Sequence, residues 1–290
     1  MSIDTVQTSK INPFASMEYP MLAAAYHSDT GLNASTIKAC VAALNPLQVV
    51  PAKGRAYRNE SRQQSAALVI GSAAHALILE GDKVYRDQFA IMPTVDRRTK
   101  AGKSEVAAWL LDNANSTGIT ESQDYLVRSM AAAVRDCKPA RELLRGGMAE
   151  RSFFWTDRET HIDCKARLDY ITGDGIVVDL KTCMNATEDG FSSSVAKYRY
   201  HVQAAFYRRA FREYYGGDPP PFRFVAVEKT APHSVGVCEL SEDSLAAADD
   251  IISIALRLWA RGNDAEKNFG CYTIDLRPYQ NHLSAMEENA

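Results

Sequence analysis

Two aspartates and a lysine in one short segment have the types and spacing that metal-dependent hydrolysis requires. The segment 161–183 contains Asp169, Asp179 and Lys181. Within it, Gly173-Asp174-Gly175 separates two apolar runs and predicts a hairpin turn. If these three residues form the loop, Asp169 lies directly across from Asp179, with the two Cβ atoms about 5 Å apart. A loop of two or four residues would shift this register by one.

Two carboxylates at that distance repel each other unless positive charge lies between them, and a divalent cation is the natural candidate. Lys181 follows Asp179 by two residues and shares its face of the strand. A bound metal polarises a phosphate and lowers the pKa of a bound water, while a neighbouring lysine can offset charge on the phosphate. The alternative is a surface hairpin with scattered charges, since Asp-x-Lys triplets are common on solvated faces.

Along the chain, several helices are predicted before the strands that carry these residues. Helical spacing, N-caps and terminating glycines or prolines predict helices over residues 36–44, 65–80, 104–112, 122–144, 197–214 and 241–261. Patterns of β type predict strands over 151–155, 162–171, 176–182, 222–228 and 234–240. Residues 51–62 and the basic stretch 92–104 are expected to be loops, and Asp-x-Lys is expected at the edge of the sheet.

This order predicts an α/β (α+β) fold with a central mixed β-sheet flanked by helices. We expect an irregular N-terminal segment over residues 1–30 and a C-terminal tail over 271–290. Between them, residues 31–270 should form a single domain whose N-terminal helices pack on the sheet.

The composition limits the class of protein. The chain has 290 residues, 46% of them hydrophobic, which is ample material for a buried core. No stretch approaches the roughly 20 apolar residues that span a bilayer, and the N-terminus lacks a signal pattern, so we expect a cytosolic (cytoplasmic) protein without a membrane partner. The six cysteines form no CxxC pair, which disfavours zinc or iron–sulfur sites. A net charge of −3 argues against a passive DNA-coating protein and is compatible with an enzyme.

The segment 161–183 and four other stretches resemble the PD-(D/E)XK nucleases, specifically the RecE-type exonucleases (exodeoxyribonuclease VIII) with their RecB-like and lambda-exonuclease relatives. Residues 71–80 are similar to the first motif of the family, a helix that carries a histidine ligand. Gln203-x-x-x-Tyr207 is similar to the Q-x-x-x-Y motif, and residues 97–103 to the basic loop of RecE-type nucleases. Residues 26–46 are similar to the N-terminal helical lead-in. The resemblance covers roughly residues 20–260.

The resemblance implies a role for each matching residue. Metal ligands would be His75, Asp169, Asp179 and the carbonyl of Leu180, and Lys181 would be the catalytic lysine. Gln203 and Tyr207 would brace the site or hold the DNA backbone, and Arg97, Arg98, Lys100 and Lys103 would contact phosphates. Read without the resemblance, His75 is a core histidine, Gln203 and Tyr207 are ordinary helix packing, and the basic stretch is a solvated loop.

Three further features remain open in the sequence. Asp-x-Lys departs from the commoner Glu-x-Lys form of the motif, a departure that RecE-type members tolerate. Glu150, just before the strand predicted over 151–155, is a candidate additional acidic ligand. Tyr198, Tyr200 and Tyr207 could stack on frayed bases, although tyrosines on a helix more often pack in the core.

The implied activity is Mg²⁺-dependent hydrolysis of double-stranded DNA from its ends, 5′ to 3′, with Mn²⁺ able to substitute. The 3′ single strand left behind would serve phage-type recombination, with a single-strand annealing protein as partner and a ring-shaped homo-oligomer around the DNA. Two alternatives stay open. One is a structure-specific or restriction-type endonuclease, although no appended sequence-reading domain is visible. The other is a non-catalytic DNA-binding protein of the same fold, although the Asp169, Asp179 and Lys181 set is intact.

Overall fold

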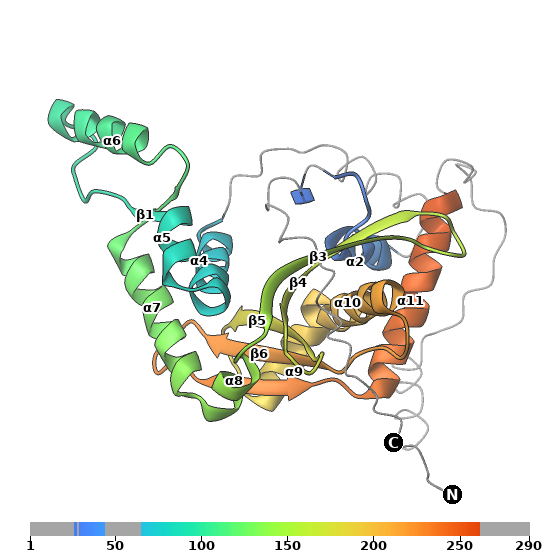
Figure 1. Cartoon of the computed structure of the whole chain (residues 1–290). Coiled ribbons are helices and arrows are strands. Elements are labelled where there is room, and N and C mark those ends of the chain that lie inside the picture. Colours follow the sequence, from blue (N-terminus) through green and yellow to red (C-terminus); the bar gives the residue numbers. More distant parts are fainter. Residues whose placement is uncertain (1–25, 28, 44–64, 262–290) are drawn as a thin grey trace, which may run out of the picture.

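A five-stranded mixed sheet forms the centre of the protein (Figure 1). The computed structural model describes residues 26–27, 29–43 and 65–261. The strand order is β3-β4-β5-β6-β7, with β5 parallel to β6 and the other neighbouring pairs antiparallel. A separate two-stranded parallel sheet joins β1 to β2. The strands are β1 (Phe89–Ile91), β2 (Thr117–Ile119), β3 (Met148–Thr156), β4 (Asp163–Ile171), β5 (Val177–Cys183), β6 (Phe222–Glu228) and β7 (Val235–Glu239).

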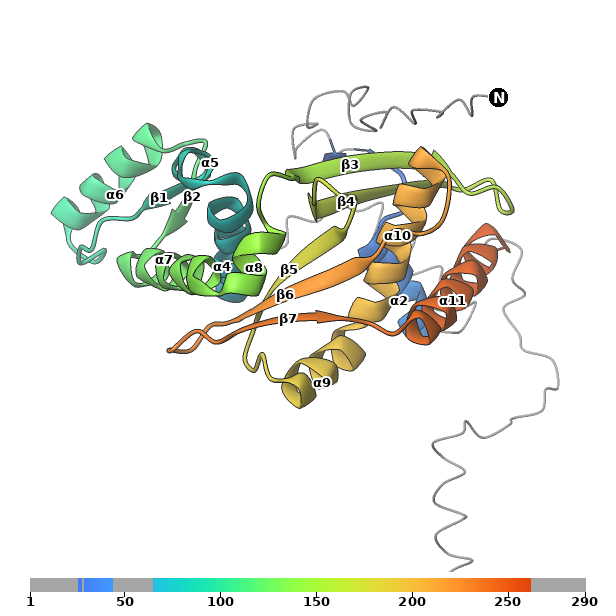
Figure 2. The ribbon, with the colours of Figure 1, turned by 60° about the horizontal axis from the view of Figure 1, so that its bottom comes forward.

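Helices cover both faces of the large sheet, as the sequence predicts (Figure 2). The helices are α2 (Ala34–Ala43), α4 (Ala66–His75), the π-helical turn η1 (Ala76–Glu80), α5 (Asp82–Gln88), α6 (Lys100–Asp112), α7 (Glu121–Asp136), α8 (Lys138–Leu143), α9 (Glu188–Tyr198), α10 (Tyr200–Tyr215) and α11 (Glu242–Arg261). One apolar cluster joins the sheet to α2, α9, α10 and α11, and a second joins it to α4, η1, α7 and α8. The prediction of a mixed sheet flanked by helices is therefore confirmed.

The alternation of side chains along β5 decides which residues face which layer. Val177 packs in the cluster on the α10 side, whereas Val178 and Leu180 pack in the cluster on the α4 side. Asp179 and Lys181 therefore point toward the α10 layer, because successive strand residues face opposite sides.

The β4–β5 hairpin and the helix that carries His75 form as predicted. The pairs Tyr170↔Val178 and Ile171↔Val177 have the register that a three-residue loop over 173–175 requires. The predicted helix over 65–80 begins at its N-cap Ser65 and ends at Gly81, whose φ of +97° favours glycine.

Two predicted helices are each divided in the structure. The helix predicted over 122–144 breaks at Cys137 into α7 and α8, because Pro139 has no N–H to donate and is tolerated only in the first turn of a helix. The helix predicted over 197–214 is preceded by a separate helix, α9, and begins only at Tyr200. Arg199, with φ of +54°, ends α9 in the left-handed conformation and redirects the chain.

The stretch predicted as a basic loop is partly helical. Helix α6 begins at Lys100, because the Thr99 side chain accepts a hydrogen bond from the Gly102 N–H and caps it. Lys100 and Lys103 thus lie on a helix, whereas Arg97 and Arg98 precede it. Together, β1, α6 and β2 form an arm that extends away from the large sheet, as Figures 1 and 2 show.

The position of Asp-x-Lys differs from the prediction. The sequence predicts a buried strand that ends in Asp-x-Lys at the edge of the sheet. Strand β5 is buried and central, but it does not end there, and Asp179 is fully buried within it. The strand continues to Cys183 because its last residues pair with β6. The sequence analysis does not predict β1, β2, α5 or α9. The two strands have three residues each and α5 has seven, which is too short for a clear pattern, whereas α9 has eleven.

Some predictions fall outside the described residues: the irregular segment over 1–25, the loop over 51–62, the C-terminal end of the first helix at residue 44, and the tail over 271–290. Within the part of the chain that the structure describes, none of the helices combines the length and apolar character that crossing a bilayer would need.

Arg209 ties α10 to its neighbours and so fixes the helix that carries two predicted site residues. It is buried and donates to Asp249 Oδ1 at 2.8 Å and to Ser253 Oγ at 2.8 Å, and it lies 3.7 Å from Asp157 Oδ2. We expect Arg209→Met to lower the free energy of unfolding by about 2–3 kcal/mol, because it leaves partly buried carboxylates unpaired.

The matched control is Arg257→Met, whose partner Glu159 and whose own side chain are largely exposed. Its loss should stay below about 1 kcal/mol. Urea unfolding of both variants measures the difference, and equal losses would contradict the role assigned to Arg209.

Candidate active site

Asp169 and Asp179 lie where β4 and β5 separate. The two strands pair only at Tyr170↔Val178 and Ile171↔Val177, and the next pair in that register would be Asp169 and Asp179. At this point the Leu180 N–H donates to the Asp169 side chain (3.0 Å to Oδ2). The ladder thus ends at the two aspartates, where a side chain replaces a backbone carbonyl as the acceptor, and both carboxylates are buried.

Glu150 extends this row of acidic residues onto a third strand. The register of β3 with β4 places Glu150 opposite Asp169, but Glu150 is skipped in the pairing and has φ of +52°. A non-glycine residue in this left-handed region is strained, which redirects its side chain. Arg167 Nε donates to Glu150 Oε2 at 2.5 Å and holds the carboxylate in place. We name Glu150, Asp169 and Asp179 the acidic row.

His75 faces the acidic row from α4. Its Nε2 lies 2.8 Å from the carbonyl oxygen of Leu180, which can only accept, so Nε2 carries the proton. Burial, followed by the charge of Lys181, lowers the pKa of His75 and favours the neutral ring. Nδ1 then presents a lone pair, and this atom lies 3.5 Å from Asp169 Oδ2.

The group fits a divalent cation. His75, Glu150 and Asp169 each offer one ligand atom, and these atoms lie within 4.8 Å of one another. A lone pair that faces a carboxylate oxygen at 3.5 Å is repulsive unless a cation or a proton lies between them. Burial, and then repulsion from Asp179, raise the pKa of Asp169 well above its usual range, so the carboxylate lacks compensating charge. Two carboxylates and an imidazole are a ligand set for a divalent metal ion.

Asp179 is held by donors on both of its oxygens. Lys181 forms an ion pair with Oδ2, and Gln203 Nε2 donates to Oδ1 at 2.8 Å. The same amide nitrogen donates to the hydroxyl of Tyr207 at 3.1 Å, one helical turn away. The structure therefore brings together Asp179, Lys181, Gln203 and Tyr207 as the sequence places them.

The predicted ligand set and the structural cluster overlap only in part. His75 and Asp169 belong to the cluster, whereas Asp179 is engaged by Lys181 and Gln203, and the Leu180 carbonyl oxygen accepts from His75. Glu150 takes the third place in the cluster, and it lies within β3 rather than before the strand. The ligand roles of Asp179 and Leu180 stay predictions.

Lys38 joins the site and was not found in the sequence. This residue of α2 donates from Nζ to Gln203 Oε1 at 3.2 Å, although the two residues are 165 positions apart. An ammonium group only donates, so Gln203 must present its oxygen to Lys38 and its nitrogen to Asp179. Burial, followed by repulsion from Lys181, lowers the pKa of Lys38 to about 8. No local pattern around Lys38 signals this contact, because it depends on the packing of α2 against α10.

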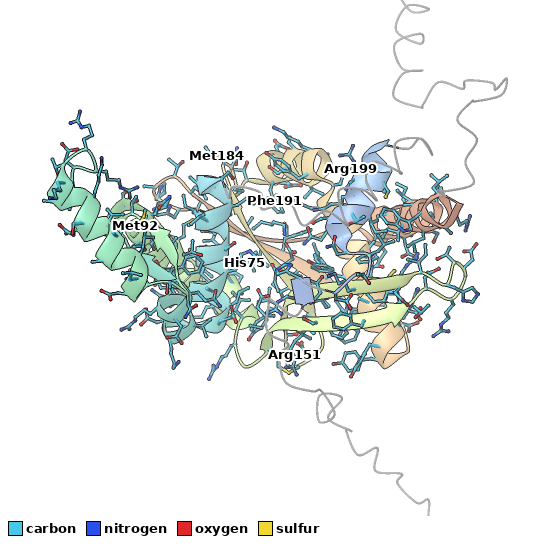
Figure 3. All side chains as sticks on the ribbon, turned by 90° about the horizontal axis from the view of Figure 1, so that it is seen from above. His75, Met92, Arg151, Met184, Phe191 and Arg199 are labelled. Carbon is cyan, nitrogen blue, oxygen red and sulfur yellow. The ribbon has the colours of Figure 1, made fainter. Side chains whose placement is uncertain are left out.

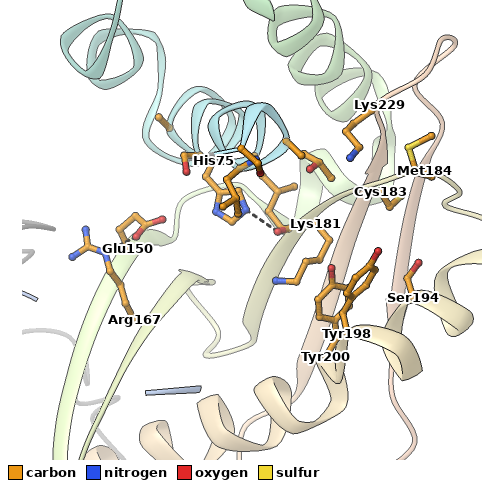
Figure 4. A pocket seen from close by; sticks show the side chains of 18 of the residues that line it. His75, Glu150, Arg167, Lys181, Cys183, Met184, Ser194, Tyr198, Tyr200 and Lys229 are labelled. Atoms are coloured by element: carbon orange, nitrogen blue, oxygen red, sulfur yellow. Dashed lines mark hydrogen bonds and ion pairs between the residues drawn. The ribbon is translucent and has the colours of Figure 1, made fainter. Parts of the chain in front are cut away.

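The site opens into a cleft of about 870 Å³. His75 and Leu68 of α4 line one side, and Tyr198 and Tyr200 at the junction of α9 and α10 line the other. Figure 4 shows Lys181 between His75 and the two tyrosines, with Glu150 and Arg167 at the far end. Of the site residues, His75, Glu150 and Lys181 line this cavity, whereas the buried Asp169 and Asp179 do not.

The basic residues predicted to bind DNA do not line this cleft. Arg97, Arg98, Lys100 and Lys103 are exposed on the arm, and Arg98 pairs with Asp96 at 3.1 Å. Figure 3 shows Met92, at the base of the arm, well away from His75. Any DNA contact of these residues would therefore lie at a distance from the acidic row.

The cluster predicts a measurable affinity for Mn²⁺. We expect wild-type protein to bind Mn²⁺ in titration calorimetry. Asp169→Asn or Glu150→Gln should weaken binding by more than about tenfold, because even residues that only hydrogen-bond to a metal ligand contribute that much to affinity. Asp189→Asn, a carboxylate exposed in the first turn of α9, is the control and should bind as wild type does. Equal affinity in all four proteins would exclude the cluster as the metal site.

Comparison with known proteins gives a family and a fold. The model of a PDDEXK-like domain of unknown function, DUF3799, matches residues 40–271. A solved protein from Eubacterium rectale described as a "Putative exonuclease" superposes with a TM-score of 0.59 at 13% identity, over 85% of this chain and 88% of that one. At this identity the likeness concerns the fold.

A second solved structure, SSO0001, aligns at 12% identity over 78% of this chain and 76% of its own, with a TM-score of 0.30 that supports no conclusion. Among curated proteins, none matches the chain significantly. The family model spans most of the described residues and includes the acidic row, Lys181 and the Gln203 helix. The resemblance to PD-(D/E)XK nucleases is thus confirmed, and this chain belongs to the PDDEXK-like family DUF3799.

Proposed function

We propose that this chain is a metal-dependent exodeoxyribonuclease that hydrolyses double-stranded DNA from an end, 5′ to 3′. The observation that carries the proposal is that one cleft is lined by His75 and Glu150, which form a cluster with buried Asp169, and by Lys181, which forms an ion pair with buried Asp179. Ligands for a cation and a charged lysine side by side are what phosphodiester hydrolysis requires.

The cluster would hold Mg²⁺, which when bound polarises a phosphate oxygen and lowers the pKa of its water. Lys181 carries its proton at neutral pH: burial lowers its pKa, but Asp179 and Asp169 outweigh burial and raise it overall. It therefore acts as a hydrogen-bond donor and positive charge beside the phosphate, not as a base. Neutral His75 keeps its proton on Nε2 through the Leu180 carbonyl and leaves Nδ1 as a ligand atom.

Gln203, Tyr207 and Lys38 act on the geometry of this arrangement. The Gln203 amide fixes Asp179 Oδ1, so the other oxygen stays directed toward Lys181. Lys38 and Tyr207 in turn fix the amide, since each contacts it at a different atom. The carboxylate and the lysine are thus preorganised before substrate arrives.

Attack from an end, rather than within the duplex, is supported by the sequence resemblance to RecE-type exonucleases and by the printed description of the Eubacterium rectale protein. The polarity, the 3′ single strand for recombination, the annealing partner and the ring-shaped homo-oligomer rest on the resemblance alone. An endonuclease remains the second candidate, and the following experiment separates the two.

Digestion of linear and covalently closed circular duplex DNA tests the proposal. With Mg²⁺, wild-type protein should degrade only the linear form, and EDTA should abolish the reaction. Lys181→Met should lower kcat by at least about 100-fold, because it removes a charge aimed at the phosphate. Lys83→Met, an exposed lysine paired with Asp87 on α5, is the control and should act as wild type does.

Two results would contradict the proposal. Cutting of the closed circle would assign an endonuclease, and binding of DNA without hydrolysis of either form would assign a non-catalytic protein. DNA labelled separately at its 5′ and 3′ termini gives the polarity in the same reactions.

The arm predicts a contribution to binding of the duplex. Replacing Lys100 and Lys103 by Gln should raise KM, leave kcat unchanged and lower the slope of log KM against log salt by about two, as expected if two phosphates lose their partners. The control replaces Lys83 and Lys138, exposed lysines paired with acidic residues one turn away. Identical salt slopes for both double variants would show that the arm does not contact DNA.

A further inference from the structure

We propose that Tyr198 is a stacking platform for an unpaired nucleobase of the DNA strand next to the catalytic centre. This inference rests on the proposed function, because it takes the cleft to receive a DNA strand. It adds to that function a binding position for one base. It also specifies that the DNA strand is unpaired where it binds.

The first observation is a column of aromatic rings that leads from the core into the cleft. Phe224 of β6 is fully buried, and its ring centroid lies 6.1 Å from that of Tyr200. The ring of Tyr198 stacks on Tyr200 with centroids 5.6 Å apart and an interplanar angle of 30°. Left-handed Arg199 between the two helices places the two tyrosines side by side. The column ends at Tyr198, which is 51% exposed, so a further flat group can extend it.

The second observation is the apolar character of the cleft mouth. Leu68 and Met184 also line the cleft, and 55% and 70% of these residues are exposed. Single exposed apolar side chains are ordinary, but three large ones gathered in one cleft mark a site that takes an apolar surface. Packing in the core, the other reading of Tyr198 from the sequence, does not account for this exposure.

The third observation is the positive charge that surrounds the rings. Over the Tyr200 ring, Lys181 Nζ lies 4.9 Å and Lys38 Nζ 5.7 Å from the centroid. Lys197 Nζ lies over the Tyr198 ring, 5.3 Å from its centroid, and a stacked base would displace this exposed side chain toward the phosphates. Aromatic rings together with lysines are the combination that binds a nucleic acid strand, since bases stack and phosphates pair with the charges. Lys181 contacts the next ring inward, so the platform lies one ring from the proposed catalytic lysine (Figure 4).

Stacking on Tyr198 requires a base with a free face. Inside a duplex both faces of each base are covered by its neighbours, so only a terminal or single-stranded base can use the platform. A cleft of about 870 Å³ accommodates a few nucleotides of one strand and not a turn of duplex. The strand to be cut therefore enters the cleft unpaired.

An abasic scan tests the platform without relying on hydrolysis. A dye-labelled 12-nucleotide single strand, and versions with one abasic position each, are titrated in EDTA with wild type, Tyr198→Ala, Tyr198→Phe and Tyr214→Ala. Tyr214 is a tyrosine of similar exposure near the C-terminal end of α10, and it does not line the cleft. Thermal melting of each variant checks that the fold is kept.

The platform predicts that one abasic position weakens wild-type binding about tenfold, and that Tyr198→Ala weakens binding of the intact strand equally. The two losses should not add, because each removes the same stack, and Tyr198→Phe and Tyr214→Ala should bind as wild type does. The inference would be overturned if the abasic position weakened binding to Tyr198→Ala as much as binding to wild type. It would also be overturned if wild type did not bind the strand. If coupling is found but Mg²⁺ supports no digestion, the platform stands and the nuclease proposal fails.

Discussion

The arrangement of the protein depends on a row of three acidic side chains across adjacent strands, of which Asp169 and Asp179 are buried and Glu150 is partly buried. Glu150, Asp169 and Asp179 occupy β3, β4 and β5 at the level where the ladder between β4 and β5 ends. Charges of one sign this close and this buried are unfavourable unless positive charge compensates them. Arg167 and Lys181 supply part of it at either end of the row, and the lone pair of His75 faces the middle. A divalent cation held by His75, Glu150 and Asp169 would complete the balance.

The surrounding elements can be understood as supports for this row. The ladder between β4 and β5 ends at the aspartates, the Glu150 backbone is strained where its carboxylate approaches Asp169, and α4 brings His75 to both. Helix α10 supplies the amide that fixes Asp179, and Arg209 fixes α10 against α11. Strain and buried charge concentrated at one place, with well-packed layers around it, is the distribution expected of a functional site.

The sequence predicts much of this because its strongest signals are local. The length of the turn over 173–175 determines the register of the hairpin, and the spacing of Asp179 and Lys181 determines that they share a face. The contact of Lys38 with Gln203 could not be predicted, since it joins elements 165 residues apart. Nor could the left-handed backbone of Glu150, because glycine is the usual residue there. The break at Pro139, in contrast, had a readable signal.

A crystal structure of the protein soaked with Mn²⁺, with anomalous scattering to locate the ion, tests the central claim most directly. The account predicts one anomalous peak bounded by Nδ1 of His75 and the carboxylates of Glu150 and Asp169. A peak bound only elsewhere, or none at saturating Mn²⁺ with the acidic row unchanged, would contradict it.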